Sequence, residues 1–225
     1  MSKDKLTLAK LHTLASNDVF IENLLRRLTV KTYEEFLDVL YDDLMLAVHR
    51  LEQNPQHYTE EQEDATTQRL LDILFGMSYT ASHDMQSGGN VDVTIEFTQK
   101  RLRWIGEAKR FNSVGDMRAG YLQLSTRYTP GAGSVQAAHG GLIGYLRRKD
   151  AAACMSGWKS HFGNDVEPAA TFETCSRRGQ LGFISETSHH VLGIPFKVWH
   201  FCVALYFQPL DKSGLAAKKY KPASK

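Results

Sequence analysis

Two adjacent strand-like segments in residues 90–110, NVDVTIEFTQKRLRWIGEAKR, constrain the fold of this chain more than any other stretch. From residue 91 to residue 97, apolar residues alternate with polar ones, which is the period of a half-buried strand. Residues 98–101 form a polar turn, and the second segment is largely apolar until it ends in Glu107-Ala108-Lys109. The stretch therefore predicts two neighbouring strands of one sheet, with charged side chains gathered at one edge.

The rest of the chain supplies helices on both sides of this pair. Helical spacing of apolar residues follows the capping residues 16–18 and Thr32, and Pro55 ends the second of these helices. A third helix is expected over residues 59–76, with Thr59 and Gln62 as a capping box. Further helices are expected over residues 114–128, ended by the segment at Pro130, and from Asp150. Strands are expected near residues 77–84, 140–146, 181–185 and 196–207.

This order predicts an α/β fold with a central sheet flanked by helices. We expect a helical extension in residues 1–56, a main domain in residues 57–210 and a basic, mobile tail in residues 211–225. The extension shows no residues suited to chemistry. It is expected to mediate homodimer formation or docking to a partner protein, or else simply to form part of the core.

Composition restricts the class of protein. The chain has 225 residues, of which 42% are hydrophobic and 23% charged, which is typical of a folded globular domain. A net charge of +2 is too small to indicate nucleic-acid binding by itself. The three cysteines do not suggest a disulfide framework, and neither a signal-peptide core nor an apolar run of about 20 residues is present. A soluble cytoplasmic protein without membrane contact is expected.

The charged residues on the strand pair suit metal-assisted cleavage of a phosphodiester. Such cleavage requires a cation that neutralises the phosphate and a positioned, activated water. Asp92 and Glu107 offer the carboxylates that Mg²⁺ prefers, and the carbonyl of Ala108 could add a ligand. Strand alternation places Glu107 and Lys109 on one face, where Lys109 could orient the water or stabilise charge on the phosphate.

Asp92, followed on the next strand by Glu107-Ala108-Lys109, resembles the signature of the PD-(D/E)XK nuclease superfamily. The resemblance covers residues 59–148, and Val91 stands where the signature has proline. It implies a restriction-endonuclease-like central mixed sheet flanked by helices, here with an N-terminal helical extension. The branch of the superfamily is unassigned.

The resemblance also implies roles for two residues outside the strand pair. Glu63 looks like the acidic residue that the superfamily carries on a preceding helix, where it would complete the metal site. Without the resemblance, a helix-start carboxylate is better explained as capping and solvation. Gln123 resembles a glutamine found in the following helix of several branches, where it would support catalysis.

The expected function is therefore a deoxyribonuclease that uses Mg²⁺ or Mn²⁺, as an effector or nuclease subunit in antiviral defence or DNA processing. DNA is the expected substrate, with RNA as an open alternative. Basic residues near the motif are expected to contact the nucleic-acid backbone. These are Arg110, Arg118, Arg127, Arg147 and Arg148.

Two other interpretations of the same residues stay open. The chain could be a non-catalytic nucleic-acid-binding or assembly subunit on the same fold, or its charged residues could form a surface ion pair of little energetic value. A zinc site and an ATPase are disfavoured. The histidines His189, His190 and His200 match no standard zinc spacing with Cys175 or Cys202, and the glycine-rich residues 131–144 lack the end of a phosphate loop.

Overall fold

The protein is described here by a computed structural model covering residues 7–83, 85–86, 90–127, 138–190 and 192–210. The tail expected over residues 211–225 and the helix end expected at Pro130 lie outside these ranges. The helices are α1 (Leu8–Ala15), α2 (Val19–Thr29), α3 (Tyr33–Glu52), α4 (Glu63–Gly76), α5 (Val114–Thr126) and α6 (Ala151–His161).

The strands form a seven-stranded mixed sheet and a short two-stranded ribbon. The sheet has the order β1-β4-β5-β6-β9-β8-β7, in which β5–β6 and β6–β9 are parallel and the other pairs are antiparallel. The ribbon pairs β2 with β3. The strands are β1 (Thr80–Ser82), β2 (Met85–Gln86), β3 (Asn90–Val91), β4 (Val93–Phe97), β5 (Leu102–Arg110), β6 (His139–Leu146), β7 (Thr171–Thr174), β8 (Gly182–Ser188) and β9 (Pro195–Ala204).

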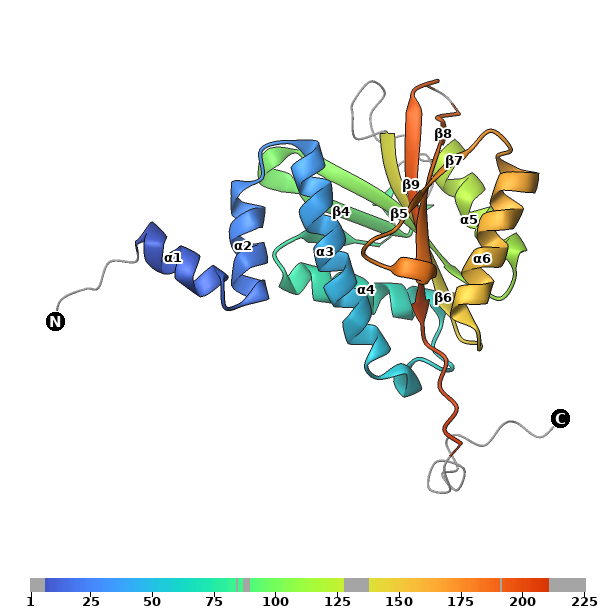
Figure 1. Ribbon diagram of the computed structural model, residues 1–225, viewed down its shortest axis with the longest axis horizontal. Helices are drawn as coiled ribbons and strands as arrows, with labels where there is room; N and C mark the ends of the chain where they lie inside the picture. Colours follow the sequence, from blue (N-terminus) through green and yellow to red (C-terminus); the bar gives the residue numbers. More distant parts are fainter. Residues whose placement is uncertain (1–6, 84, 87–89, 128–137, 191, 211–225) are drawn as a thin grey trace.

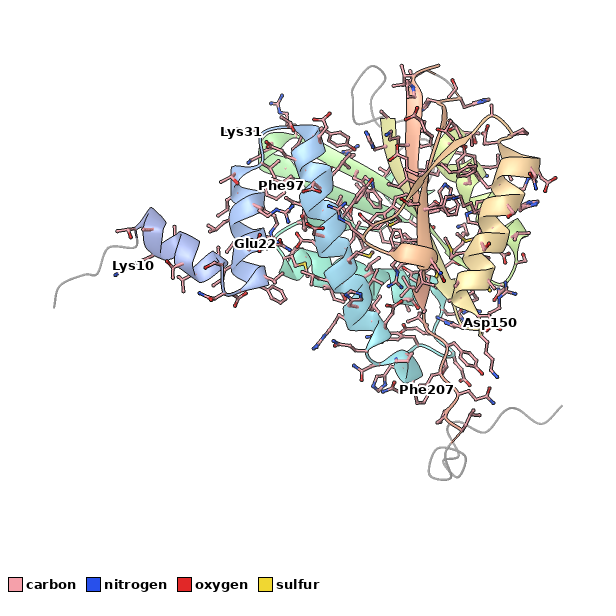
Figure 2. The ribbon with its side chains drawn as sticks, viewed as in Figure 1. Lys10, Glu22, Lys31, Phe97, Asp150 and Phe207 are labelled. Atoms are coloured by element: carbon pink, nitrogen blue, oxygen red, sulfur yellow. The ribbon has the colours of Figure 1, made fainter. Side chains whose placement is uncertain are left out.

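Helices cover both faces of the sheet, which confirms the predicted α/β class (Figure 1). Side chains of α3 and α4 share one apolar core with the sheet, and side chains of α5 and α6 share a second core on the opposite face. Figure 2 shows these side chains filling the space between the helices and the sheet. Helix α3, although within the expected extension, packs directly into the first core through Leu40, Leu44 and Val48, which are fully buried.

Helices α1 and α2 lie outside these two layers. Helix α2 packs against α3, and α1 packs against α2 and extends away from the sheet (Figure 1). The predicted caps of the N-terminal helices are confirmed, because Asp18 accepts main-chain bonds at the start of α2 and Thr32 forms a capping box with Glu35. No helix in the described ranges has the length and apolar composition needed to cross a bilayer.

Two details of the predicted elements are wrong. Helix α4 begins at Glu63 instead of Thr59, and its N-cap, Gln62, makes no side-chain capping bond. The strand expected over residues 91–97 is interrupted at Asp92, between β3 and β4. As a result, Val91 packs in the core below α5 and Val93 in the core below α3, although simple alternation would place both on one face.

On the α3 side of the sheet, a side chain packs closely against the paired strands β5 and β6. Gly106 is paired with Gly141, and the indole of Trp104 covers both glycines. A Cβ atom built on Gly141 would lie 2.2 Å from Trp104 Cζ2, and one built on Gly106 would lie 2.9 Å from the same ring. Neither position can hold a side chain unless the indole moves.

Candidate functional site

Three carboxylates from three different elements meet at the ammonium of Lys109. The distances from Lys109 Nζ are 2.6 Å to Glu107 Oε1, 3.4 Å to Asp92 Oδ2 and 3.8 Å to Glu63 Oε1. Glu107 and Lys109 belong to β5, Asp92 precedes β4, and Glu63 is the first residue of α4. The sequence therefore predicted a group of residues that the fold brings together, and we call Glu63, Asp92, Glu107 and Lys109 the acidic cluster.

The backbone around the cluster explains how each carboxylate is held. Asp92 Oδ2 accepts the main-chain N–H of Ala108 at 3.1 Å, so the interruption between β3 and β4 turns this side chain toward β5. Glu63 Oε2 accepts the main-chain N–H of Arg110. Glu107 and Lys109 lie on the α5 side of the sheet because they alternate with Ala108, which packs in the α3 core.

Burial makes the cluster different from a surface ion pair. The Glu107 side chain is 0% exposed and that of Lys109 is 18% exposed. Burial alone would lower the Lys109 pKa, but Glu107, Asp92 and Glu63 outweigh it and raise the pKa above its usual value. Lys109 is thus a firmly held cation, and three carboxylates facing one ammonium leave negative charge in excess.

Helix α5 packs against the acidic cluster at Gly120. A Cβ atom at this position would lie 2.8 Å from Lys109 Cγ, 2.9 Å from Leu142 Cδ1 and 3.4 Å from Glu107 Cγ. Gly120 therefore permits a close approach of the helix to the two charged side chains. Gly120 was not predicted as a site residue, although a glycine inside a helical pattern is a signal of close packing.

Two of the predicted nucleic-acid-binding arginines are bound at the start of α4. The main-chain carbonyl of Glu61 accepts from Arg110 Nη2 at 2.8 Å and from Arg147 Nη1 at 2.5 Å. Arg147 Nη2 also donates to Thr66 Oγ1 at 3.1 Å. Burial, and secondarily the charge of Arg110, lower the pKa of Arg147. These contacts fix the segment that carries Glu63, and the sequence analysis did not predict the part that Glu61 plays.

The other predicted residues lie further from these contacts. Arg148 is exposed and its guanidinium lies 5.7 Å from the centroid of the Phe111 ring, whereas Arg118 and Arg127 are exposed on or just after α5. Gln123 is half-buried on α5, and its side chain makes no hydrogen bond to the acidic cluster within the described residues.

One of the histidines that raised the question of zinc, His200, has a structural role. His200 is fully buried; Trp158 Nε1 donates to its Nδ1 at 3.1 Å, and its Nε2 lies 2.8 Å from Ser185 Oγ. Burial lowers the pKa of His200 to about 3. A neutral ring with Nδ1 as acceptor leaves Nε2 as the donor to Ser185, so both nitrogens are occupied by protein partners.

The carboxylate oxygens of the cluster are the type of ligand that a hard divalent cation such as Mg²⁺ binds. Mg²⁺ binds through one or two carboxylates together with water and substrate oxygens, and the buried carboxylate of Glu107 needs a compensating cation. Across the described residues, no group of three or more His, Cys, Asp or Glu side chains has the geometry of a preformed metal centre. In the described arrangement the compensating cation is the Lys109 ammonium.

Comparisons with protein-family models, with curated proteins and with solved structures find no match to this chain.

Proposed function

We propose that this chain is a nuclease that hydrolyses phosphodiester bonds in DNA with the help of Mg²⁺ or Mn²⁺, on a restriction-endonuclease-like fold. One observation carries the proposal: Glu63, Asp92 and Glu107, which come from separate elements, all lie within 3.8 Å of the Lys109 ammonium. Carboxylates that can hold a metal and a cation beside them suit such hydrolysis, which needs charge on the phosphate to be neutralised and a water to be activated.

The residues would divide the work as follows. Asp92 and Glu107 would hold the metal, with Glu63 and the Ala108 carbonyl as further oxygen ligands. The bound metal would neutralise the phosphate and lower the pKa of a coordinated water. Lys109 would turn its ammonium from the carboxylates toward the attacking water or the phosphate, where its positive charge stabilises the charge that develops.

The basic residues divide into two groups under this proposal. Arg110 and Arg147 already donate to the carbonyl of Glu61, so their main contribution would be to keep Glu63 in place. Arg118, Arg127 and Arg148 are exposed and would contact the phosphate backbone without reading sequence. Gln123 would support the site after a side-chain rearrangement.

A Mn²⁺-binding measurement by electron paramagnetic resonance, paired with plasmid nicking, tests the proposal. The wild-type chain should bind Mn²⁺ and nick plasmid DNA, and both properties should be lost in Asp92→Asn and Glu107→Gln. Lys109→Met should retain Mn²⁺ binding and lose nicking. Lys197→Met is the matched control, because Lys197 pairs with Glu173 at 2.8 Å on an exposed part of β9.

The competing function is a non-catalytic nucleic-acid-binding or assembly subunit. It is favoured by the contact of Lys109 with all three carboxylates, since an internally compensated cluster can serve stability alone. If Mn²⁺ binds neither the wild type nor the variants while the folded state is intact, the nuclease proposal is refuted. Metal binding without nicking would point to a nuclease that requires an activating partner.

A further inference from the structure

Helix α2 presents its apolar side to solvent and its polar side to the protein. The residues of α2 that are buried are Asn23 and Arg27. Phe20, Leu24 and Leu28, spaced four residues apart on one side of the helix, are 61%, 41% and 63% exposed. A helix packed on a core normally shows the opposite arrangement.

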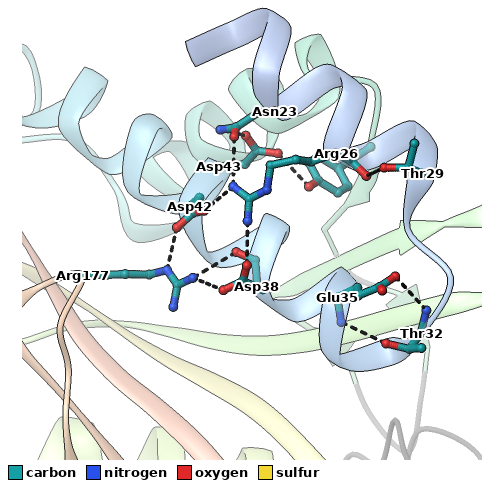
Figure 3. Close-up of polar contacts among 10 residues, drawn as sticks. Asn23, Arg26, Thr29, Thr32, Glu35, Asp38, Asp42, Asp43 and Arg177 are labelled. Carbon is teal, nitrogen blue, oxygen red and sulfur yellow. Dashed lines mark hydrogen bonds and ion pairs between the residues drawn. The ribbon is translucent and has the colours of Figure 1, made fainter. Parts of the chain in front are cut away.

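Polar contacts hold the inner side of α2 in this orientation. Asp43, which is fully buried in α3, accepts from Arg27 Nη1 at 2.5 Å and from Asn23 Nδ2 at 3.1 Å. Arg26 bonds Asp38 and Asp42 at 2.6 Å each, and Figure 3 shows these aspartates shared with Arg177. The arginines beside the apolar stripe thus pair with aspartates of the same chain. The stripe itself carries no charge that could pair with a charged partner.

Two further apolar residues near the stripe are exposed. Val19, the first residue of α2, is 57% exposed, and Leu14 of α1, the helix that packs against α2, is 47% exposed. At roughly 150 Å² for each side chain, the five apolar residues expose on the order of 400 Å², about half of what one partner buries in a standard interface. A patch of this size is comparable to the largest apolar patch that a typical monomer exposes, and such patches are often functional.

A groove that could accept such a surface lies on the same chain. It has a volume of about 700 Å³ and begins at Phe20. Its other lining residues come from α3, α4 and the positions that follow them. They include the apolar Leu46, Ile73 and Met77 and the polar His49, Arg50 and Gln53. A chain that carries both a projecting apolar hairpin and a partly apolar groove can pair with an identical chain, so that each hairpin covers the other's groove.

We infer that α1 and α2 form the interface of a two-fold symmetric homodimer, in which the stripe Phe20-Leu24-Leu28 of each copy covers the groove beside the stripe of the other. The polar remainder of a standard interface would come from the rim around the stripe. This inference concerns assembly and is independent of the proposed nuclease activity.

Sedimentation or light scattering of the full chain tests the inference. The wild type should be a dimer, twice 25.4 kDa, at micromolar concentration. Leu24→Glu and Phe20→Glu should each raise the dissociation constant about a hundredfold or more, because a two-fold interface loses the side chain twice. Leu122→Glu is the matched control, since Leu122 is a helical leucine with 38% exposure, close to the 41% of Leu24.

Circular dichroism of each variant, with Leu24→Ala as a milder substitution, separates loss of assembly from loss of folding. A wild type that stays monomeric at 100-fold higher concentration overturns the inference. So does a dimer that persists in both Leu24→Glu and Phe20→Glu. A monomer whose stripe instead binds neutral lipid vesicles would also overturn it and assign the surface to a membrane.

Discussion

Replacing Lys109 by Met should destabilise the protein through the carboxylates that the ammonium compensates. The ammonium lies 2.6 Å from Glu107 Oε1, and the Glu107 side chain is 0% exposed. Removing one partner of a buried ion pair costs about 3–5 kcal/mol. We expect about 3 kcal/mol, the lower end, because Lys109 is 18% exposed and water can approach the space it leaves.

A second substitution identifies the cause of this loss. In the Lys109→Met background, Glu107→Gln removes the buried negative charge, so at least half of the lost stability should return. Lys197→Met serves as the control, because Lys197 pairs with Glu173 at 2.8 Å but both side chains are exposed by 37% or more. That change should cost less than about 1 kcal/mol.

Urea denaturation in EDTA, followed by fluorescence, measures these free energies. A change of the midpoint at constant slope reports stability, and the corresponding fall in Tm for Lys109→Met is about 6–12 °C. The reasoning is refuted if Lys109→Met costs no more than Lys197→Met, or if Glu107→Gln restores nothing. Under the proposed function, Mg²⁺ at ten times its Kd should then stabilise Lys109→Met by about 1.4 kcal/mol.

Three further predictions concern packing, pH and helix attachment. Gly120→Ala should destabilise the protein by about 1–3 kcal/mol in urea titrations, because the added Cβ lies 2.8 Å from Lys109 Cγ. Gly157→Ala on α6, where no atom lies within 4 Å of the added Cβ, should instead be stabilising by about 0.5–1 kcal/mol, and equal effects of the two changes would contradict this packing. His200 has a folded pKa of about 3 against 6.5, so the unfolded chain binds the extra proton between these values and stability falls as the pH falls, by about 1.4 kcal/mol per pH unit. In thermal melts from pH 7 to pH 4, stability should therefore fall less steeply with falling pH for His200→Gln than for the wild type. Equal slopes would show that burial of a neutral His200 is not the source of the pH dependence. Arg27→Met leaves Asp43 buried without its guanidinium partner and should cost about 3–5 kcal/mol in urea titrations. Arg26→Met, whose pairs with Asp38 and Asp42 are partly exposed to water, should cost only about 1 kcal/mol, and similar losses would refute the distinction.

Local patterns predicted the parts of the site that depend on one strand or one helix cap. Alternation along β5 placed Glu107 and Lys109 together, and their 2.6 Å contact confirms this placement. The caps at Asp18 and Thr32 were predicted for the same reason, since a cap is a contact between residues a few positions apart.

Features of the structure that depend on contacts between distant parts of the chain could not be predicted from the sequence. The start of α4 was predicted four residues too early, because Arg110 and Arg147 bind the carbonyl of Glu61 and hold that segment outside the helix. The interruption at Asp92 depends on a bond to the N–H of Ala108 on another strand. The edge strand β7 and the short helix α1 were not predicted. The mostly exposed side chains of β7 give only a weak pattern of alternation.

The pairing of Gly106 with Gly141 beneath Trp104 bears on how β5 and β6 find their alignment during folding. A shift of one residue in the pairing of β5 with β6 would turn every side chain of the shifted strand to the opposite face. The apolar side chains would then no longer fit the two cores. A shift of two residues keeps each face intact, so apolar patterning alone cannot reject it. That shift would place His139 or Ile143 beneath the indole, where a glycine is required. Trp104 therefore selects one alignment of the two strands. Without it, Glu107 and Lys109 of β5 could lie about 7 Å from their present position along β6.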